Sequence, residues 1–325
     1  MIKRRKYKYM KKKSKNEVKI AGYVYQNNQD PRIGLSVKTV QNANSANYGK
    51  EFISGNLDIA VDEDGMNVIT VHFMYVTADK KKDTFNNLKQ IIQNPDKTWI
   101  MGGKENAFKV SVSGALELNE FISNRTNEVV STIRIDGGFL NMINGSLPEP
   151  KKRNTFSMDM LINKVNRVEA DPEKNIDKDF VRVGGAVFNF KNELLPVTFV
   201  CRNEQGMACF EDMDASVSNP TYTNVWGRIN CMTIKTERVT ESAFGEPEVQ
   251  TYENKQREWL ITGMITVPYE FGDESIMTAD DLKKAVQDRE VKLAGIRRDK
   301  EEYEARKASS MNPKIQPKMD TSFDF

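Results

Sequence analysis

The chain has 325 residues, and a chain of this length usually forms two domains, each large enough to bury its own core. Lys and Arg total 48 against 46 Asp and Glu, but residues 1–15 hold nine basic side chains and no acid. Removing these nine from the formal charge of +2 leaves a body near −7, which excludes a globally positive surface and restricts any polyanion site to a local groove.

The N-terminal segment, residues 1–17, is predicted to be a disordered basic arm, with Met10 as a second plausible start. It leads into no signal-peptide core, and no apolar run approaches the roughly 18 residues of a membrane span. The three cysteines, Cys201, Cys209 and Cys231, lack CxxC spacing and are expected to be free thiols. These features predict a cytoplasmic protein with no membrane contact.

Residues 18–145 are expected to form a first small β-barrel. The β-rich run 68–76 places Ile69, Val71, Phe73 and Tyr75 on one face at period two. Further strands are predicted at 108–114 and 129–135, with a helix at 83–93 between the first two runs.

A linker is predicted at 146–154, where two prolines accompany a charge run. Residues 155–272 should form a second small barrel, with strands at 156–168, 180–190, 196–202, 223–236 and 258–267. In the last of these, Trp259 shares a face with Ile261 and Ile265 and is expected in the core.

The two halves resemble each other weakly. Residues 50–53 with Gly55 match 178–181 with Gly184, and residues 112–116, around Gly114, match 225–229, around Gly227. Glycine inside a strand marks a sharp bend or bulge, as small barrels need at their corners. The pattern favours two tandem β-barrels, with chance similarity between β-rich segments as the alternative.

After residue 272 the pattern becomes helical, and a helix is predicted at 273–310 with a cap at Ser275 or Thr278. Leu282, Val286, Leu293, Ile296 and Tyr303 form a short apolar seam broken by charged residues, which favours docking on the barrels over self-association. Residues 311–325 are predicted to be a disordered tail.

Enzymatic chemistry has little support in the sequence. The one histidine, His72, lies mid-strand with no neighbouring Cys or His, which favours a structural role. There is no phosphate-binding loop, dinucleotide fingerprint or nucleophile elbow. Asp62, Glu63 and Asp64 precede Gly65 and are interpreted as a solvated, inert hairpin tip. We therefore expect no catalytic residue, metal or cofactor.

One strand carries residues suited to nucleic acid. Period two places Val225 and Ile229 on one face and Asn224, Trp226 and Arg228 on the other. A ring that stacks on a base, with a cation beside it for phosphate, is what single-stranded nucleic acid requires. The alternative is that Trp226 packs under a helix or loop.

Further contacts to nucleic acid are predicted elsewhere. Tyr222 and Trp99 are weaker candidates for stacking, and Lys109 suits a groove wall. A basic loop is predicted to clamp the backbone, unless it is simply solvated: Lys80, Lys81 and Lys82.

The last six residues alternate acids with aromatics. Phe323 and Phe325 are apolar anchors on a tether that cannot bury them, and Asp320 and Asp324 would meet basic groups at the rim of a partner's pocket. An ordinary frayed end is the alternative.

Two barrel-like halves with Gly-bent strands, followed by an acidic-aromatic tip, resemble a single-stranded DNA-binding protein with tandem oligonucleotide-binding (OB) folds, as in some bacteriophages. The resemblance covers residues 18–270 as architecture and 311–325 as tail. It implies a non-enzymatic role in DNA replication and recombination, in the host cytoplasm, with the tip recruiting replication or repair proteins. The tip has only two acids and no penultimate proline, which departs from that family.

A virion structural protein, with β-rich domains and termini that lace subunits together, suits the same arm, helix and tail. Stacking residues on one barrel face favour the DNA-binding hypothesis. The sequence leaves open DNA against RNA, the oligomeric state and the partner of the tip.

Overall fold

The computed structural model describes residues 14–27, 34–78, 82–171, 176–240, 248–265, 267–270 and 278–310. Its strands are β1 (Asn16–Asn27), β2 (Ser36–Thr39), β3 (Glu51–Ala60), β4 (Val68–Thr77), β5 (Lys109–Ile122), β6 (Val129–Met142), β7 (Asn154–Val168), β8 (Phe180–Phe188), β9 (Leu194–Cys201), β10 (Thr221–Thr240) and β11 (Glu248–Met264). The helices are α1 (Lys82–Gln93), α2 (Trp99–Gly102), α3 (Glu204–Glu211) and α4 (Ala279–Ser310), with 3-10 turns η1 (Pro95–Lys97), η2 (Lys104–Asn106) and η3 (Pro150–Lys152). The predicted mainly-β class and each strand expected in both halves are confirmed.

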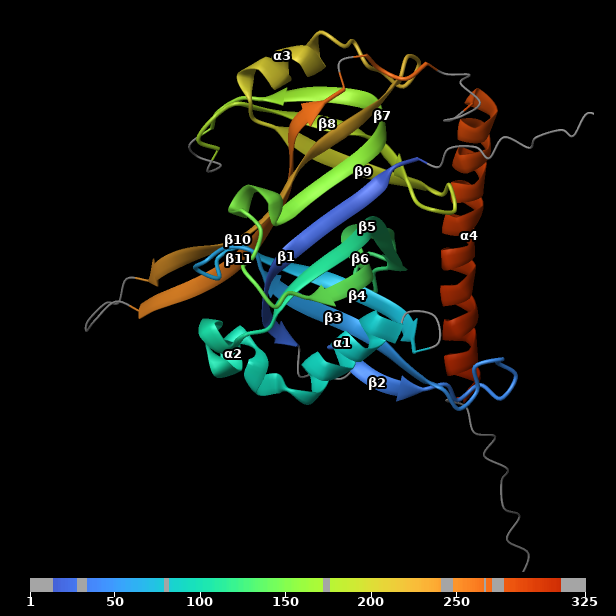
Figure 1. Ribbon diagram of the computed structural model, residues 1–325. Helices are drawn as coiled ribbons and strands as arrows, with labels where there is room; N and C mark the ends of the chain where they lie inside the picture. The colour runs from blue at the N-terminus through green and yellow to red at the C-terminus, as the bar shows by residue number, and fades with distance from the viewer. Residues whose placement is uncertain are drawn as a thin grey trace, which may run out of the picture.

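The strands form one sheet of eleven, in the order β10-β11-β9-β8-β7-β1-β5-β6-β4-β3-β2. Two further pairings, β1 with β3 and β7 with β10, return the sheet onto itself. They close a first circuit of β1, β3, β4, β5 and β6, and a second of β7, β8, β9, β10 and β11. Figure 1 shows the second circuit above the first, with β1 running between them.

The two circuits have the same connectivity. In each, the third and fifth strands pair in parallel, β4 with β6 and β9 with β11, while the other neighbours are antiparallel. A helix follows the third strand in each, α1 in the first circuit and α3 in the second. The segments that resemble each other in sequence lie on corresponding strands, which accounts for the similarity.

The two glycines matched in sequence lie at corresponding bulges. Gly114 on β5 and Gly227 on β10 each lie at a register shift against the next strand. A Cβ on Gly114 would lie 2.3 Å from the Asp136 carbonyl oxygen, and one on Gly227 would lie 1.9 Å from that of Leu260. Any side chain would push the strands apart at these points, so the bend requires glycine.

The sequence predicts two separate units, whereas the structure joins them through β1. The N-terminal half of β1, Asn16 to Ile20, pairs with β7, and its C-terminal half pairs with β3. Because β1 borders both circuits, one hydrophobic cluster runs through both and includes Phe156, Phe199 and Trp259. The core position predicted for Trp259 is confirmed.

Helix α4 packs along one side of both circuits (Figure 1). Thr278 caps it: its Oγ1 accepts from the Asp281 N–H at 3.2 Å, and the Asp281 carboxylate accepts from the Thr278 N–H at 2.9 Å. The predicted docking of this helix on the chain's own sheet is confirmed by its contacts with β5, β6 and β9. Thr278 is one of the two predicted caps, and the other, Ser275, lies outside the described residues.

The predicted apolar seam of α4 is wrong in part. Val286 and Tyr303 are exposed, whereas Arg289, expected to interrupt the seam, lies on the packed face and donates to Glu120 of β5 at 2.7 Å. Lys292 also reaches Glu120, at 3.3 Å, and Glu193 at 3.5 Å. The helix is held by ion pairs beside a small apolar contact at Ala285, because its sequence is too polar for an apolar seam.

Candidate nucleic-acid interface

The strands β6, β5, β1, β7 and β10 share an outward face, and one register row crosses all five. Cross-strand partners in a sheet project to the same side. Phe139 pairs with Ser113, Ser113 with Lys19, and Lys19 with Thr155. Thr155 then pairs with Arg228. We call Phe139, Ser113, Lys19, Thr155 and Arg228, with the neighbouring Trp226, the sheet row.

The sheet row has a ring near each end, with Lys19 on the strand at its middle and Arg228 beside Trp226 on β10. Phe139 is 58% exposed and Trp226 is 40% exposed. Lys19 is exposed and pairs with Glu17 at 2.9 Å, while no ion pair of Arg228 occurs among the described residues. At about 4.8 Å between strands, the four steps from β6 to β10 span roughly 19 Å along the sheet.

Trp226 lies across the neighbouring strand β11. It is the register partner of Gly263, and a Cβ on Gly263 would lie 2.6 Å from the indole ring. The absent side chain therefore makes room for the ring on the surface. Trp226 and Arg228 lie on the outward face that the sequence predicts for them.

Two other predicted contact residues are not on the surface. Tyr222 and Asn224 are only 1% and 8% exposed. The Tyr222 hydroxyl hydrogen-bonds Ser14 Oγ at 2.7 Å, and Asn224 Nδ2 donates to Asp159 at 2.8 Å. Burial raises the pKa of Tyr222. The segment before β1 and Tyr269 cover this end of β10, which period-two reasoning cannot foresee, so both residues are corrected to structural roles.

Trp99 and Lys109 meet around Tyr23, a residue that no pattern in the sequence singles out. The Trp99 ring lies edge-on to Tyr23, with centroids 5.5 Å apart, and Lys109 Nζ lies 5.9 Å from the Tyr23 centroid. Lys104 Nζ lies 5.6 Å from the centroids of both rings. Tyr23, Tyr25, Trp99, Lys104 and Lys109 form what we call the Trp99 cluster.

The Trp99 cluster and the sheet row share the outward face of β1, since Lys19 and Tyr23 are four residues apart on the same strand. Ala21, between them, is buried and interrupts the face. The predicted basic loop cannot be placed, because Lys80, Lys81 and the side chain of Lys82 lie outside the described residues.

Glu63 lies beside the Trp99 cluster and forms ion pairs, so it is not the inert hairpin tip that the sequence predicts. Its carboxylate lies 2.6 Å from both Lys104 Nζ and Arg153 Nη1. Hydrogen bonds from Lys104 and then Arg153 lower the pKa of Glu63 to about 2. The sequence pattern of three acids before Gly65 contains no signal of these partners, which come from η2 and from the connection between β6 and β7.

The sequence does not single out Phe139 as a surface ring on a strand, because the two residues before it, Gly137 and Gly138, are typical of a turn. In the structure these glycines lie within β6, and the register shift there falls at Gly138. A Cβ on Gly137 would meet the Phe73 ring at 2.4 Å. A strand thus continues through the glycines and carries Phe139 onto the outward face.

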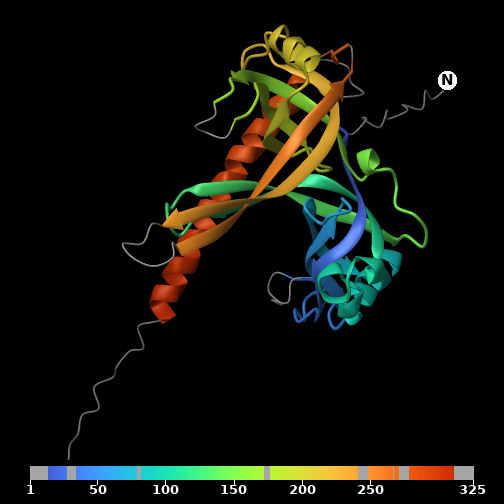
Figure 2. The ribbon, with the colours of Figure 1, turned by 90° about the vertical axis from the view of Figure 1, so that its left-hand side faces the viewer.

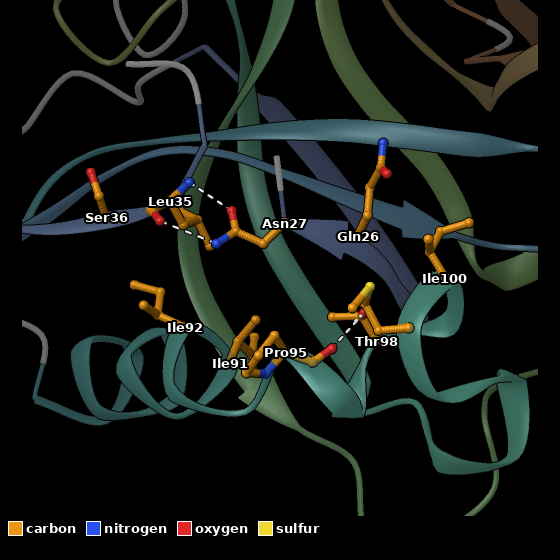
Figure 3. Close-up of a pocket in the computed structure, with 10 residues that line it drawn as sticks. Gln26, Asn27, Leu35, Ser36, Ile91, Ile92, Pro95, Thr98 and Ile100 are labelled. Carbon is orange, nitrogen blue, oxygen red and sulfur yellow. Dashed lines mark hydrogen bonds between the residues drawn. The ribbon is translucent and has the colours of Figure 1, made fainter. Parts of the chain in front are cut away.

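A pocket of about 320 Å³ lies between the end of β1 and the α1–α2 segment. Figure 3 shows the Asn27 side chain bonded to the backbone of Leu35 and Thr98 Oγ1 bonded to the Pro95 carbonyl. Its other walls include Ile91, Ile92 and Ile100. Among the described residues that line it, none is charged, so they supply no cation for phosphate.

Within the described ranges, no three His, Cys, Asp or Glu side chains gather so as to hold a metal ion. His72 is half-buried, and its Nδ1 lies 2.9 Å from Asn56 Oδ1. Burial, followed by the nearby Arg134, lowers the pKa of His72. In the same part of the chain, no helix has the length and apolar character needed to cross a membrane.

Comparison with known proteins gives a family and weak likenesses to solved structures. The family model described as YorF matches residues 15–299. The single-stranded DNA-binding protein from Thermus aquaticus, as a deletion mutant, aligns with 13% identity over 80% of this chain and 98% of that chain, at a TM-score of 0.44. The wild-type protein aligns over the same shares with 13% identity and a TM-score of 0.42. No curated protein matches the sequence.

Proposed function

The chain belongs to the YorF family, and we propose that it binds single-stranded DNA through the sheet row, without reading its sequence. The observation that carries the proposal is the row itself, which extends across both circuits with a ring near each end, Lys19 at its middle and Arg228 beside Trp226. Rings stack on any base, because every base has a π face, and cations neutralise the phosphates.

The strand pairing supports a related proposal about the fold. Five strands closed into a ring are the plan of the OB barrel, which binds oligonucleotides on its sheet face and adjoining loops. We propose that each circuit is an OB-like domain, the first over residues 18–145 and the second over 155–272. The two extra pairings, β1 with β3 and β7 with β10, are what support it.

The shape of the surface favours a single strand over a duplex. Between the two rings the row presents the short side chains Ser113 and Thr155, on strands hydrogen-bonded on both sides. Over the row itself, the described residues place no helix or projecting ribbon that could enter a major groove; the ribbon of β10 and β11 seen in Figures 1 and 2 continues past Arg228. The rings can stack only on bases that are not already stacked in a helix.

Trp226→Ala and Phe139→Ala are each expected to weaken binding of an oligo(dT) by about 1–3 kcal/mol at fixed salt. Fluorescence anisotropy with a labelled single strand measures the loss, and a duplex and an oligo(U) of equal length test the preference. Phe190→Ala is the matched control, because Phe190 is also an exposed ring but lies outside the row. Normal affinity in both row variants, or a preference for duplex, would contradict the proposal.

The cations of the row should set the salt dependence. Each phosphate contact on a single strand adds about 0.7 to the slope of log affinity against log salt, so Lys19→Ala with Arg228→Ala should flatten it by roughly 1.4. Deleting residues 1–13 should flatten it further, because this segment carries eight basic side chains and no acid. This deletion spares Ser14 and Lys15, whose hydrogen bonds to Tyr222 and Asp159 belong to the fold. An unchanged slope would show that these groups do not touch DNA.

The last six residues, which lie outside the described ranges, are proposed to recruit replication or repair proteins through Asp320, Phe323, Asp324 and Phe325. Acids at the tip repel phosphate, so removing residues 320–325 should keep or slightly raise affinity for single strands. The same truncation should abolish pull-down of replication proteins from the native host. Loss of DNA affinity, or retention of every partner, would leave the tip without this role.

A further inference from the structure

Strand β4 departs from regular alternation near its end. Ile53 pairs with Val76, but two residues further along β3 Gly55 pairs with Phe73. Met74 and Tyr75 therefore lie together opposite Ser54, in a bulge. Phe73 and Val76 are both buried, so the bulge turns two successive apolar side chains outward.

Tyr75 is exposed, although the period-two pattern predicts it on the buried face with Ile69, Val71 and Phe73. Its ring is 41% exposed and Met74 is more exposed still. The backbone φ of Tyr75 is 44°, a left-handed conformation that is a genuine outlier for a bulky residue. Such outliers persist where the surrounding structure imposes them, and they cluster at functional sites.

The outward ring of Tyr75 is held in a fixed position. It stacks on Phe52 of β3, with centroids 4.5 Å apart and 28° between the planes. A ring held by a neighbouring ring is preorganised, so it loses little freedom when a third ring stacks on it.

The pair Phe52–Tyr75 lies on β3 and β4, the strands that follow β6 in the sheet. Beyond β6, which carries Phe139, the next strands are β4, β3 and β2. β4 and β6 run parallel with Val71 opposite Ile135, and Tyr75 and Phe139 each lie four residues further on. Lys38 of β2 is the register partner of Phe52 and is exposed, with Nζ 3.2 Å from Ser54 Oγ.

The charges near this pair suit phosphate. Glu51, the nearest acid on β3, is paired with Lys89 at 2.8 Å, and Asp136 on β6 is paired with Arg134 at 2.7 Å. With these acids paired, Lys38 is an exposed cation beside the rings.

We propose that Phe52 and Tyr75 form a stacking platform for an unpaired nucleobase, with Lys38 on an adjoining phosphate. The proposal rests on single-stranded DNA binding by the sheet row and extends the path from β6 over β4 and β3. The bulge provides the platform by turning outward a ring that regular alternation would bury.

The test uses a variant that keeps the backbone and removes the ring. Asn tolerates the left-handed region, so Tyr75→Asn should fold with unchanged or higher thermal stability. Its affinity for a long oligo(dT) should fall roughly 5- to 150-fold, as for one lost stacked base. Tyr75→Phe keeps the ring and should bind like the natural chain.

Photo-cross-linking gives a second measurement. An oligonucleotide carrying 5-bromodeoxyuridine should cross-link to the peptide that contains Tyr75, and mass spectrometry identifies it. If Tyr75→Asn binds like the natural chain and no cross-link forms there, while Trp226→Ala still weakens binding, the platform is overturned and the sheet row stands. If the natural chain binds no single strand, the proposed function itself fails.

Discussion

Trp259→Ala is expected to lower the free energy of unfolding by about 3–5 kcal/mol, the cost of removing a large aromatic side chain from a core. Trp259 is 3% exposed and lies between Phe156 and Phe199, with ring centroids 5.3 and 5.6 Å away. Because the hydrophobic cluster is shared by both circuits, the loss should appear as one cooperative transition in urea, followed by fluorescence and circular dichroism.

Two further substitutions test whether the loss of stability is specific to a ring buried in the core. Trp259→Phe keeps a ring and removes an indole N–H that has no hydrogen-bond partner among the described residues, so it should cost less than the alanine variant. Trp226→Ala, on the surface, should leave stability nearly unchanged and affect only DNA binding. Equal destabilisation by both alanine variants would contradict the assignment of Trp226 to the surface.

Arg289→Ala is expected to cost about 3 kcal/mol and to loosen α4. The Glu120 carboxylate is 2% exposed and accepts from Arg289 at 2.7 Å and from Ser131 Oγ at 2.8 Å. Removing one partner of a buried ion pair costs about 3–5 kcal/mol, and the lower end applies because Lys292 still reaches Glu120.

Thermal unfolding and limited proteolysis of α4 measure the Arg289→Ala effect. Arg298→Ala is the control on the same helix, because Arg298 is exposed and makes only a 3.9 Å contact with Glu302. Its loss should stay within about 1 kcal/mol. Similar losses for the two variants would mean that the buried pair does not hold the helix.

The same carboxylate makes docking of α4 sensitive to acid. Burial alone would raise the pKa of Glu120, but hydrogen bonds from Arg289 and Ser131 and the charge of Arg289 hold it below its usual range. When the pKa of a carboxyl group is lower in the folded than in the unfolded protein, its ionisation stabilises the fold at pH values above the unfolded pKa. This contribution is lost as the pH falls through the lowered folded value, so Glu120→Gln should flatten the acid limb of stability against pH.

Much of the architecture follows from local patterns in the sequence. Alternation along 129–135 and 223–236 predicts strands, and the glycines at 114 and 227 predict the bends. These features depend on a few neighbouring residues, so one sequence is sufficient. Joining of the two units through β1 depends on pairing between residues 16–20 and 154–158, and nothing local encodes it.

The site could be predicted only in part, for similar reasons. Trp226 and Arg228 follow from alternation and from the polar character of their face. Tyr222 sits on a strand that tertiary contacts cover, and Tyr75 lies in a bulge that reverses the alternation. The error at Tyr75 comes from assuming that the side-chain period stays at two along the whole strand, and the error at Tyr222 comes from tertiary contacts that alternation does not encode.

The β1–β7 pairing also bears on the direction of a bound strand. Because β1 and β7 are the first strands of their circuits and pair antiparallel, a local twofold axis passes between them, normal to the sheet. DNA has 5′-to-3′ polarity, so a strand running straight across this axis meets the two circuits in opposite senses and cannot make identical contacts with both.

The side chains already differ at equivalent places. In the first circuit the cross-strand pair is Ser113 with Phe139, and in the second it is Trp226 with Gly263. The ring is on the fifth strand of one circuit and on the fourth strand of the other, each time opposite a small residue. This asymmetry gives a nearly symmetric scaffold the means to bind a directional polymer in one orientation.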